Sequence, residues 1–367
     1  MFPEDTLFDF VLLDLADELI AHEIPIPEPM RCDRYIARSA LQKSVRRGEV
    51  QIAQNALANL MSTSASSIWR HLTIIAMEDV GAVGIDILAR IVSASRDRNW
   101  REVHRGDWAV ASLLVRQMAE SAHCQAACDL QLHALYSPRL ERARANSQDQ
   151  DIRSLLAILS DTSRPLEARA VAAMAVGGGL IDGQHLRDAG AAFCTMAKNG
   201  RASHVAALCH AAWRITRNPM ALTLPLIWEK WSANEESALR DDALFGSSIY
   251  GGVPAYALDQ YTRVGASVAR ALLSTTPALQ TLLIGADIPP AQHQRIVGDL
   301  IFLTDGGLVR RRALWPEGER LRQPHRPLLE TAEMSVALLD EAISLVAVNA
   351  SQIDQLRQQY FIRRVEP

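Results

Sequence analysis

Residues Tyr35–Gly81 read YIARSALQKSVRRGEVQIAQNALANLMSTSASSIWRHLTIIAMEDVG. Apolar residues recur in this segment at steps of about three and four, the spacing of one face of an α-helix. Gly48 and the polar residues 62–67 interrupt the pattern, because glycine and short polar side chains favour helix ends and turns. The segment therefore predicts three successive helices, at Tyr35–Arg47, Val50–Met61 and Ser66–Met77.

The rest of the chain shows the same helical pattern. It is rich in Ala, Leu, Arg, Gln and Glu, which favour helices, and poor in the alternation of apolar and polar residues that is typical of strands. We therefore predict an all-α protein. Further helices are expected at Asp5–Ile20, Ile85–Ser95, Asp107–Tyr136, Ile152–Leu159, Leu166–Val176, His185–Lys198, His204–Arg217, Met220–Trp231 and Pro327–Arg364.

The chain has 367 residues, of which 49% are hydrophobic and 22% charged, as in a globular protein of about two or three domains. We expect residues 1–31 to form an N-terminal helix and a proline hinge. A helical bundle is expected over 32–145 and a larger helical domain over 146–367, because the charged segment 137–150 separates two helical regions.

The cysteines and the lack of a long apolar run indicate a cytoplasmic protein. The five cysteines are scattered and odd in number, which predicts reduced thiols. The start, Met1–Asp5, is acidic where a secretory signal is basic, and no run of about 18 uncharged apolar residues occurs, so we expect no membrane span. The net charge of −4 offers no general attraction for nucleic acid, so a nucleic-acid site must be local.

Several positions of the segment Tyr35–Gly81 are similar to a known family. They are Ala40-Leu41, Lys43-Ser44, Arg46, Ala53, Leu57-Ala58, Leu60, Trp69–Leu72 and Glu78–Gly81. In these positions the segment resembles the helical domain that follows the ATPase core in replication-associated recombination AAA+ proteins, the bacterial relatives of the Werner-helicase-interacting ATPase. The resemblance implies a domain of the clamp-loader lid and collar type, used for assembly and for action at replication forks.

The chain lacks the phosphate-binding loop of an ATPase. Such a loop needs glycine-rich backbone followed by Gly-Lys-Ser/Thr, so that backbone amides and the lysine hold the phosphates. Lys43-Ser44 follows Leu41-Gln42 within a predicted helix, and Gly177–Gly179 leads into Leu180-Ile181. We therefore expect a protein that is not itself an ATPase of this family, with a separate AAA+ ATPase or a replication protein as a candidate partner.

Basic residues cluster on one side of the helix predicted at Tyr35–Arg47. Lys43, Arg46 and Arg47 stand three and four residues apart, away from its apolar face. Such a cluster is either a solvated polar face, the commoner case, or a contact for a phosphate or an acidic partner. We mark these three residues as candidate interaction residues.

Glu78 and Asp79 form a second candidate interaction site. They lie near a predicted helix C-terminus, where acidic side chains are electrostatically unfavourable. Such a placement suggests a salt bridge, with Arg70 or Lys43 as the expected partner. We prefer this bridge to a catalytic role, because a carboxylate pair without further catalytic groups is a weak basis for acid–base chemistry.

The segment 245–265 is the best candidate for contact with a ligand. It holds three of the six tyrosines, and Gly251-Gly252 permits close approach of the backbone. The alternative is a tyrosine packing seam with an Asp259–Arg263 ion pair at i, i+4. The candidate ligand-binding residues are Tyr250, Gly251, Gly252, Tyr256, Asp259, Tyr261, Thr262 and Arg263.

A local excess of arginine at 309–326 is the best candidate for contact with DNA. Clustered arginines contact phosphates and an aromatic ring stacks on a base, so the segment predicts a nucleic-acid patch. The alternative is a solvated connector between helices. The candidate residues are Arg310, Arg311, Arg312, Trp315, Arg320, Arg322 and Arg326.

We predict neither a metal site nor a cofactor. His123, Cys124, Cys128 and His133 have the right chemistry for zinc, but one continuous helix cannot bring His133 beside Cys124. Buried cysteine packing is the preferred interpretation. Cys209-His210 is likewise assigned to packing or to the surface rather than to a catalytic pair.

Three functions are compatible with these features. We expect a non-ATPase binding or assembly factor in DNA replication, repair or mobile-element maintenance, which contacts nucleic acid through the arginine segment. The first alternative is an enzyme or ligand sensor with a pocket around Tyr250–Arg263. The second is a protein-interaction scaffold for a separate AAA+ ATPase. An oligomer is compatible with each, and a binding protein is preferred to an enzyme.

Overall fold

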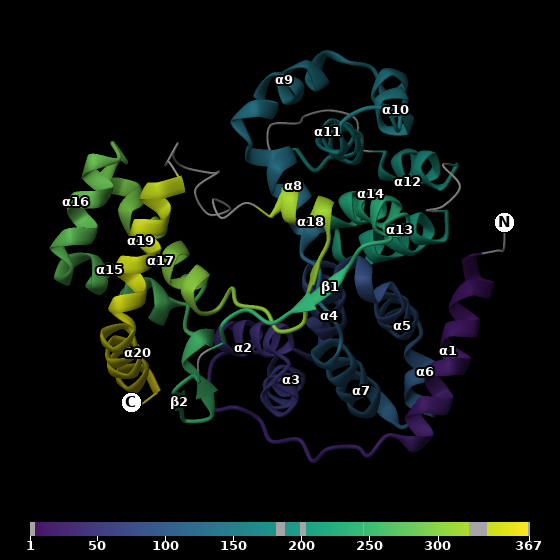
Figure 1. Ribbon diagram of the computed structural model, residues 1–367. Helices are drawn as coiled ribbons and strands as arrows, with labels where there is room; N and C mark the ends of the chain where they lie inside the picture. Colours follow the sequence, from purple (N-terminus) through teal and green to yellow (C-terminus); the bar gives the residue numbers. More distant parts are fainter. Residues whose placement is uncertain (1–3, 181–187, 199–202, 245, 323–335, 366–367) are drawn as a thin grey trace. The chain divides into compact units, whose positions relative to one another are not determined.

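The computed structural model describes residues 4–180, 188–198, 203–244, 246–322 and 336–365. Over these ranges the regular secondary structure is helical apart from two short two-stranded sheets, which confirms the predicted all-α class (Figure 1). None of the described helices combines the length and the apolar character that crossing a bilayer requires.

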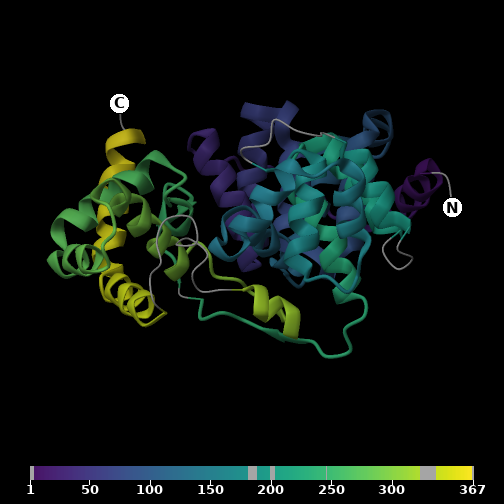
Figure 2. The same cartoon turned by 90° about the horizontal axis from the view of Figure 1, so that it is seen from above.

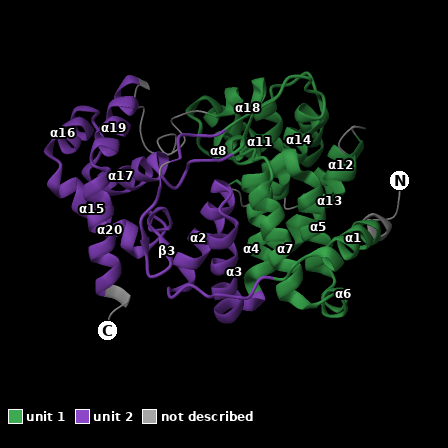
Figure 3. Cartoon of the chain, turned by 60° about the horizontal axis from the view of Figure 1, so that its bottom comes forward, with its two compact units in different colours: residues 1–24, 67–240, 311–323 green, residues 25–66, 241–310, 324–367 purple. Residues whose placement is uncertain are grey.

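The chain forms two compact units, and each is assembled from three separate segments (Figure 3). Unit 1 comprises residues 1–24, 67–240 and 311–323, and unit 2 comprises residues 25–66, 241–310 and 324–367. Both units therefore differ from the contiguous domains expected above. The segment that resembles the AAA+ helical domain is divided between them, since its residues up to Ser66 belong to unit 2 and the rest to unit 1.

Unit 1 contains most of the helices. They are α1 (Glu4–Ala21), α4 (Ile68–Ile75), η2 (Ala76–Val80), η3 (Gly81–Gly84), α5 (Ile85–Arg96), α6 (Arg98–Val103), α7 (Gly106–Glu120), α8 (Ala126–Tyr136), η4 (Pro138–Leu140), α9 (Glu141–Asp149), α10 (Ile152–Ser160), α11 (Leu166–Gly177), α12 (Ala189–Lys198), α13 (Ser203–Thr216), α14 (Met220–Trp231) and α18 (Pro316–Leu321). The strands β1 (Ala238–Arg240) and β4 (Arg312–Leu314) pair antiparallel.

Helix α11 lies at the centre of one half of unit 1. It packs on α8, α10, α12 and α14. Its alanines Ala170, Ala172 and Ala173 are buried, and such small side chains let neighbouring helices approach closely. Helix α12 also packs on α13, and the end of α11, the start of α12 and the end of α13 line the pocket described below.

Unit 2 combines a helix pair with a second group of helices. Its elements are α2 (Arg34–Arg47), α3 (Val50–Ser64), β2 (Ile249–Tyr250), β3 (Val253–Pro254), η5 (Ala255–Ala257), α15 (Arg263–Thr275), α16 (Pro277–Gly285), α17 (Pro290–Thr304), α19 (Val336–Val348) and α20 (Ala350–Val365). Helix α15 packs on α17 and α20, and the green and yellow helices lie together in Figures 1 and 2. Helix α2 packs on α3 and η5. The short turn η1 (Ala65–Ser67) follows α3.

Side-chain caps explain where several helices begin. Asp33 Oδ1 accepts hydrogen bonds from the backbone N–H groups of Tyr35 and Ile36 at 2.9 and 3.0 Å, at the start of α2. Asp151 does the same for Ser154 in α10 at 2.7 Å. These bonds satisfy amide donors that have no partner inside the helix.

Most of the predicted helices are confirmed, but the helix expected over Asp107–Tyr136 is interrupted between α7 and α8. The chain there replaces helical hydrogen bonds with tertiary ones. The backbone N–H of Cys124 donates to the carbonyl of Asp79 at 2.9 Å, and that of His123 donates to the carbonyl of Arg311 at 3.1 Å. Backbone groups of a break must find such partners when they are buried.

Two further predictions need correction. The charged segment 137–150, expected as a connector, forms η4 and α9. The long C-terminal helix is divided into α19 and α20 at Asn349, whose side-chain amide donates to the carbonyl of Leu345 at 2.6 Å. Residues 327–335 of that prediction lie outside the described residues.

Candidate ligand-binding site

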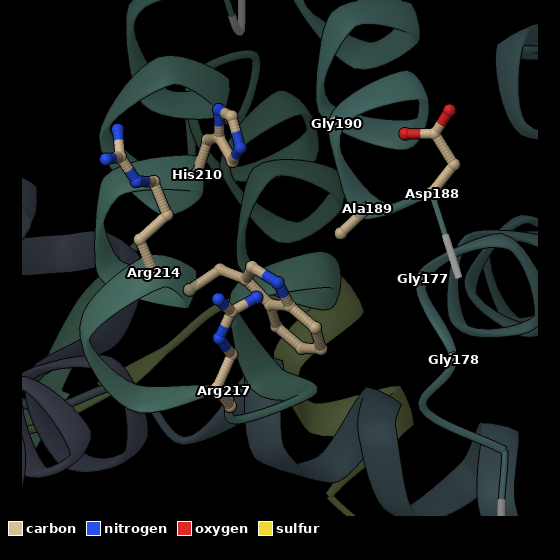
Figure 4. Close-up of a pocket in the computed structure, with 9 residues that line it drawn as sticks. Gly177, Gly178, Asp188, Ala189, Gly190, His210, Arg214 and Arg217 are labelled. Carbon is tan, nitrogen blue, oxygen red and sulfur yellow. The ribbon is translucent and has the colours of Figure 1, made fainter.

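A cavity of about 610 Å³ lies in unit 1, where the end of α11 and the start of α12 face the end of α13 (Figure 4). The basic side chains of His210, Arg214 and Arg217 stand along one side, and Asp188 stands on the opposite side. The volume falls within the range of about 300–1,000 Å³ that is typical of small-molecule pockets. We take this pocket as the candidate functional site.

The geometry of α13 produces the basic side of the pocket. His210, Arg214 and Arg217 are spaced four and three residues apart, so they project from the same face of the helix. Arg217 has φ 54°, and its N–H donates to the carbonyl of Trp213 at 2.7 Å. A left-handed residue closes a helix C-terminus in this way, and it is uncommon for residues other than glycine.

The two arginines of the pocket have no acidic partner among the residues that the structure describes. Both side chains are exposed. A third guanidinium strengthens the positive charge at this helix end, because Arg70 donates two hydrogen bonds to the carbonyl of Thr216, at 3.2 and 2.8 Å. By contrast, the buried Arg169 forms a two-pronged ion pair with Glu229.

The opposite side of the pocket is small and polar. Asp188 precedes α12, and its Oδ1 accepts a hydrogen bond from the N–H of Ala191 at 2.9 Å. Gly177, Gly178 and Gly190 line this side with backbone atoms, and a Cβ on Gly177 would collide with Cδ1 of Leu222. This side of the pocket therefore consists of small residues and one carboxylate.

Trp213 provides the apolar part of the lining. It is 9% exposed and borders the cavity. The ring of His210 stacks on Phe193 with centroids 5.2 Å apart, which holds the imidazole in place. An oxyanion beside the arginines and a flat apolar group beside the indole match this arrangement.

This site is not among those predicted from the sequence. His210 and both arginines lie on a predicted helix, but His210 was expected in packing or at the surface. The available signal was the spacing, since three basic residues four and three positions apart share one face of a helix. The Asp188 side of the pocket could not be predicted from the sequence, because Asp188 lies near these residues only in the folded chain.

The predicted ligand segment 245–265 belongs to unit 2 and has a structural role there. Strands β2 and β3 form a hairpin whose turn is Gly251-Gly252, with φ values of 57° and 86°. Both angles are positive, which glycine adopts without strain. Tyr250 donates from its hydroxyl to the carbonyl of Asp354 at 3.0 Å.

The interior of unit 2 brings the predicted ligand residues and the predicted interaction residues together. Nζ of Lys43 lies 2.6 Å from Oδ2 of Asp259, and both residues are buried. The hydroxyl of Tyr256 bonds Ser44 at 2.8 Å and donates to the carboxylate of Glu49. These contacts are internal, so they correct the solvated-face interpretation of Lys43 and agree with the packing alternative for Tyr256 and Asp259.

Arg46 and Arg47 are buried in the same way. Arg46 donates to the carbonyl of Gly306 at 3.1 Å, and Arg47 pairs with Glu49 at 3.1 Å. The guanidinium of Arg47 also lies 4.5 Å from the centre of the Tyr256 ring. Their charges therefore stabilise the unit internally.

The expected Asp259–Arg263 helix pair is not formed, because Asp259 precedes α15. Thr262 caps this helix by accepting a hydrogen bond from the N–H of Gly265 at 3.0 Å, and Arg263 is its first residue. Among the predicted ligand residues, Tyr261 is the one whose ring is largely exposed, at 73%.

Glu78 and Asp79 both lie within η2, which is a short π-helix. Asp79 is buried, and its Oδ1 accepts a hydrogen bond from the side chain of Gln125 at 3.0 Å. Of the expected bridge partners, Arg70 donates to the carbonyl of Thr216 and Lys43 pairs with Asp259, and the bridge to Glu78 or Asp79 stays a prediction.

The predicted arginine patch contains both exposed and buried side chains. Arg312 lies in β4, is 7% exposed and donates to Gln125 at 3.2 Å. Trp315 is 4% exposed and packs edge-on against Trp231. These two side chains are inside unit 1 and are not presented to DNA.

The remaining arginines of this segment lie nearer to the surface. Arg310 and Arg311 are exposed, and Arg322 is half-buried. Arg320 forms ion pairs with Glu317 and Glu167. Arg326 lies outside the described residues.

The cysteine and histidine group at 123–133 is part of the packing of unit 1. Burial raises the pKa of the Cys124 thiol, and His133 bonds the carbonyl of Leu321 at 3.0 Å. Within the described ranges, no three His, Cys, Asp or Glu side chains are grouped so as to hold a metal ion.

Comparison of the chain with protein-family models, with curated proteins and with solved structures finds no match.

Proposed function

We propose that the protein binds a small molecule carrying a phosphate or a similar oxyanion, in the pocket at the ends of α11 and α13. The observation that carries this proposal is the pair Arg214 and Arg217, which lines a cavity with no acidic partner among the described residues. Each guanidinium presents parallel N–H donors that fit two oxygens of one oxyanion. A bound oxyanion would also neutralise the charge concentrated at this helix end.

The shape of the site favours a small molecule over a nucleic acid. A cavity of about 610 Å³ has room for a ligand of modest size, whereas nucleic acids follow extended basic surfaces. The proposal therefore keeps the ligand-sensor interpretation of the sequence and moves its site from Tyr250–Arg263 to α13. DNA contact through Arg310 and Arg311 stays a separate prediction.

Calorimetric titration with inorganic phosphate and with pyrophosphate, at constant ionic strength, tests the proposal. We expect saturable binding by the native chain. Arg214→Gln/Arg217→Gln should weaken pyrophosphate binding by at least about tenfold, because a tenfold change corresponds to about 1.4 kcal/mol, less than a charge-assisted hydrogen bond contributes.

The matched control is Arg139→Gln/Arg142→Gln. These two arginines are exposed, lie in unit 1 and have the same spacing of three residues. The control removes the same charge from the unit, so its affinity should stay within about twofold of native. Equal weakening in both variants would show a general charge effect and would overturn the proposed site.

A short single-stranded oligonucleotide is the competing probe. If it binds more tightly than pyrophosphate and loses affinity in Arg214→Gln/Arg217→Gln, the arginines form a nucleic-acid surface and the small-molecule proposal fails. If it binds weakly and equally to the variant and its control, the proposal stands.

A further inference from the structure

The pocket has two ends of opposite charge. Arg214 and Arg217 form the positive end, and the carboxylate of Asp188 stands across the cavity from them (Figure 4). A ligand that fills the cavity must therefore place a negatively charged group beside the arginines and a hydrogen-bond donor or a positive group beside Asp188. This property narrows the class of ligand beyond that of a simple oxyanion.

Asp188 uses one carboxylate oxygen to cap the start of α12, and its other oxygen can bind a ligand. Oδ1 accepts the hydrogen bond from Ala191, and the start of α12 favours a negative charge at this position. Within the described part of the chain, Oδ2 has no hydrogen-bond partner. An ionised carboxylate only accepts hydrogen bonds, so the group that binds it must be a donor, such as a hydroxyl or an amine.

The lining also includes one aromatic side chain. Trp213 borders the cavity on the same helix as the two arginines, and Gly177 and Gly190 line the other side. Planar rings stack favourably on an indole, and this contact tolerates different ring types. The middle of the pocket thus fits a planar group better than an extended chain.

We propose that the ligand is a nucleotide-like phosphate ester. Its phosphate binds Arg214 and Arg217, its planar ring lies along Trp213, and its hydroxyl or amino donors reach Oδ2 of Asp188. This inference rests on the proposed function, because it needs the oxyanion to bind at the arginine end.

The first test compares three probes on the native chain by calorimetry: inorganic phosphate, ribose 5-phosphate and adenosine 5′-monophosphate. Ribose phosphate adds hydroxyl donors to the phosphate, and adenosine monophosphate adds a planar base to the ribose phosphate. We expect affinity to rise in this order, with adenosine monophosphate at least about tenfold tighter than ribose phosphate. Trp213→Leu should reduce the difference in affinity between adenosine monophosphate and ribose phosphate. Circular dichroism checks that the variant is folded.

The second test uses Asp188→Asn, which keeps a capping side chain at the start of α12 and removes the charge. Adenosine monophosphate should bind about tenfold more weakly, because a charged acceptor is lost. Inorganic phosphate should bind equally well or more tightly, because the negative charge that repels it is gone. The two probes are thus expected to respond differently to the same variant.

The outcomes separate the two proposals. If neither phosphate nor pyrophosphate binds the native chain, the proposed function fails. If they bind through Arg214 and Arg217, but adenosine monophosphate is no tighter than ribose phosphate or Asp188→Asn changes all probes alike, the oxyanion site stands and the nucleotide-like ligand is overturned.

Discussion

The ammonium nitrogen of Lys43 lies 2.6 Å from Oδ2 of Asp259, and both side chains are buried in unit 2. Ser39 joins the pair, since its hydroxyl accepts a hydrogen bond from Lys43 at 2.6 Å and donates to the carbonyl of Ala257 at 2.7 Å. The ion pair connects α2 to the turn before α15, two regions far apart in the chain. The pair links two segments of unit 2, 25–66 and 241–310. Residues 67–240, which belong to unit 1, lie between these segments in the sequence.

Lys43→Met should lower the free energy of unfolding by about 3–5 kcal/mol, because it leaves the Asp259 carboxylate buried without a cation. Urea unfolding measures the effect. The combined variant Lys43→Met/Asp259→Leu should lose less than Lys43→Met alone, since no uncompensated charge remains. Lys198→Met, at an exposed position, is the control and should change stability by less than about 0.5 kcal/mol. A Lys43→Met chain as stable as its control would contradict this account.

Arg169→Lys should destabilise unit 1 although it keeps the charge. Nη1 and Nη2 of Arg169 bond the two carboxylate oxygens of Glu229 at 3.0 and 2.8 Å, and Nε donates to the carbonyl of Leu159 at 3.0 Å. Lysine lacks the planar fork, so we expect a loss of at least about 2 kcal/mol in thermal or urea unfolding. The exposed Arg153→Lys serves as the control, and a similar small loss in both variants would sink the prediction.

The stability of the chain should fall at alkaline pH through Tyr256. Burial raises the pKa of this phenol well above its ordinary value, and the neighbouring Glu49 carboxylate adds to the rise. Below pH of about 10 the phenol is protonated in the folded and unfolded chains alike, so its contribution is fully present. Above that pH the unfolded chain releases the proton first, and the free energy of unfolding decreases by up to about 1.4 kcal/mol per pH unit.

Urea unfolding of the native chain and of Tyr256→Phe between pH 8 and pH 11 measures this difference. The decline with pH should be shallower in the variant, by about one proton released. Tyr261→Phe is the control, because Tyr261 is largely exposed, and it should decline as the native chain does. Parallel curves for Tyr256→Phe and the native chain would rule the explanation out.

A thiol reagent should modify Cys194 first. Cys194 is exposed, whereas Cys124 and Cys209 are buried and burial raises the pKa of both thiols. Cys32 is half-buried, and desolvation raises its pKa to about 12. The thiolate is the reactive form, so native protein near pH 8 should show one fast thiol. Cys194→Ser should remove the fast phase and Cys209→Ser should not, and a fast phase that survives Cys194→Ser would refute the assignment.

The arginines predicted to contact DNA should divide into two groups. Arg310→Ala/Arg311→Ala removes exposed side chains and should lower the salt dependence of DNA affinity by about one charge per lost phosphate contact. Arg312→Ala should instead reduce stability, because it removes the buried bond to Gln125. Fluorescence anisotropy over a salt series, with urea unfolding in parallel, distinguishes them. Salt dependence that is identical in Arg310→Ala/Arg311→Ala and native protein would remove this segment as a DNA contact.

Helix positions are a local property of this sequence. The helices predicted at Tyr35–Arg47 and Met220–Trp231 match α2 and α14 within a residue at either end. Periodicity, the capping residue Asp33 and the closing Gly48 are all local features, so they act in the same way wherever the helix is placed. The all-α class follows from the same local signals.

Local sequence signals do not predict which residues pack against each helix. Lys43, Arg46 and Arg47 look like a solvated face because charge in a sequence usually marks the surface. Their burial depends on carboxylates and carbonyls that other parts of the chain supply, such as Asp259 and Gly306. A buried charge is tolerated only where such partners are in place. The spacing of residues along one helix does not show which partners other parts of the chain supply.

The ligand pocket shows the same division. The sequence is enough to place His210, Arg214 and Arg217 on one face of a helix, since residues three and four apart are neighbours in any α-helix. Folding alone sets Asp188 across from them and leaves a cavity between, because that distance depends on how α11, α12 and α13 pack on one another. Local hydrogen bonding therefore explains the elements of this protein, and long-range packing explains its pocket.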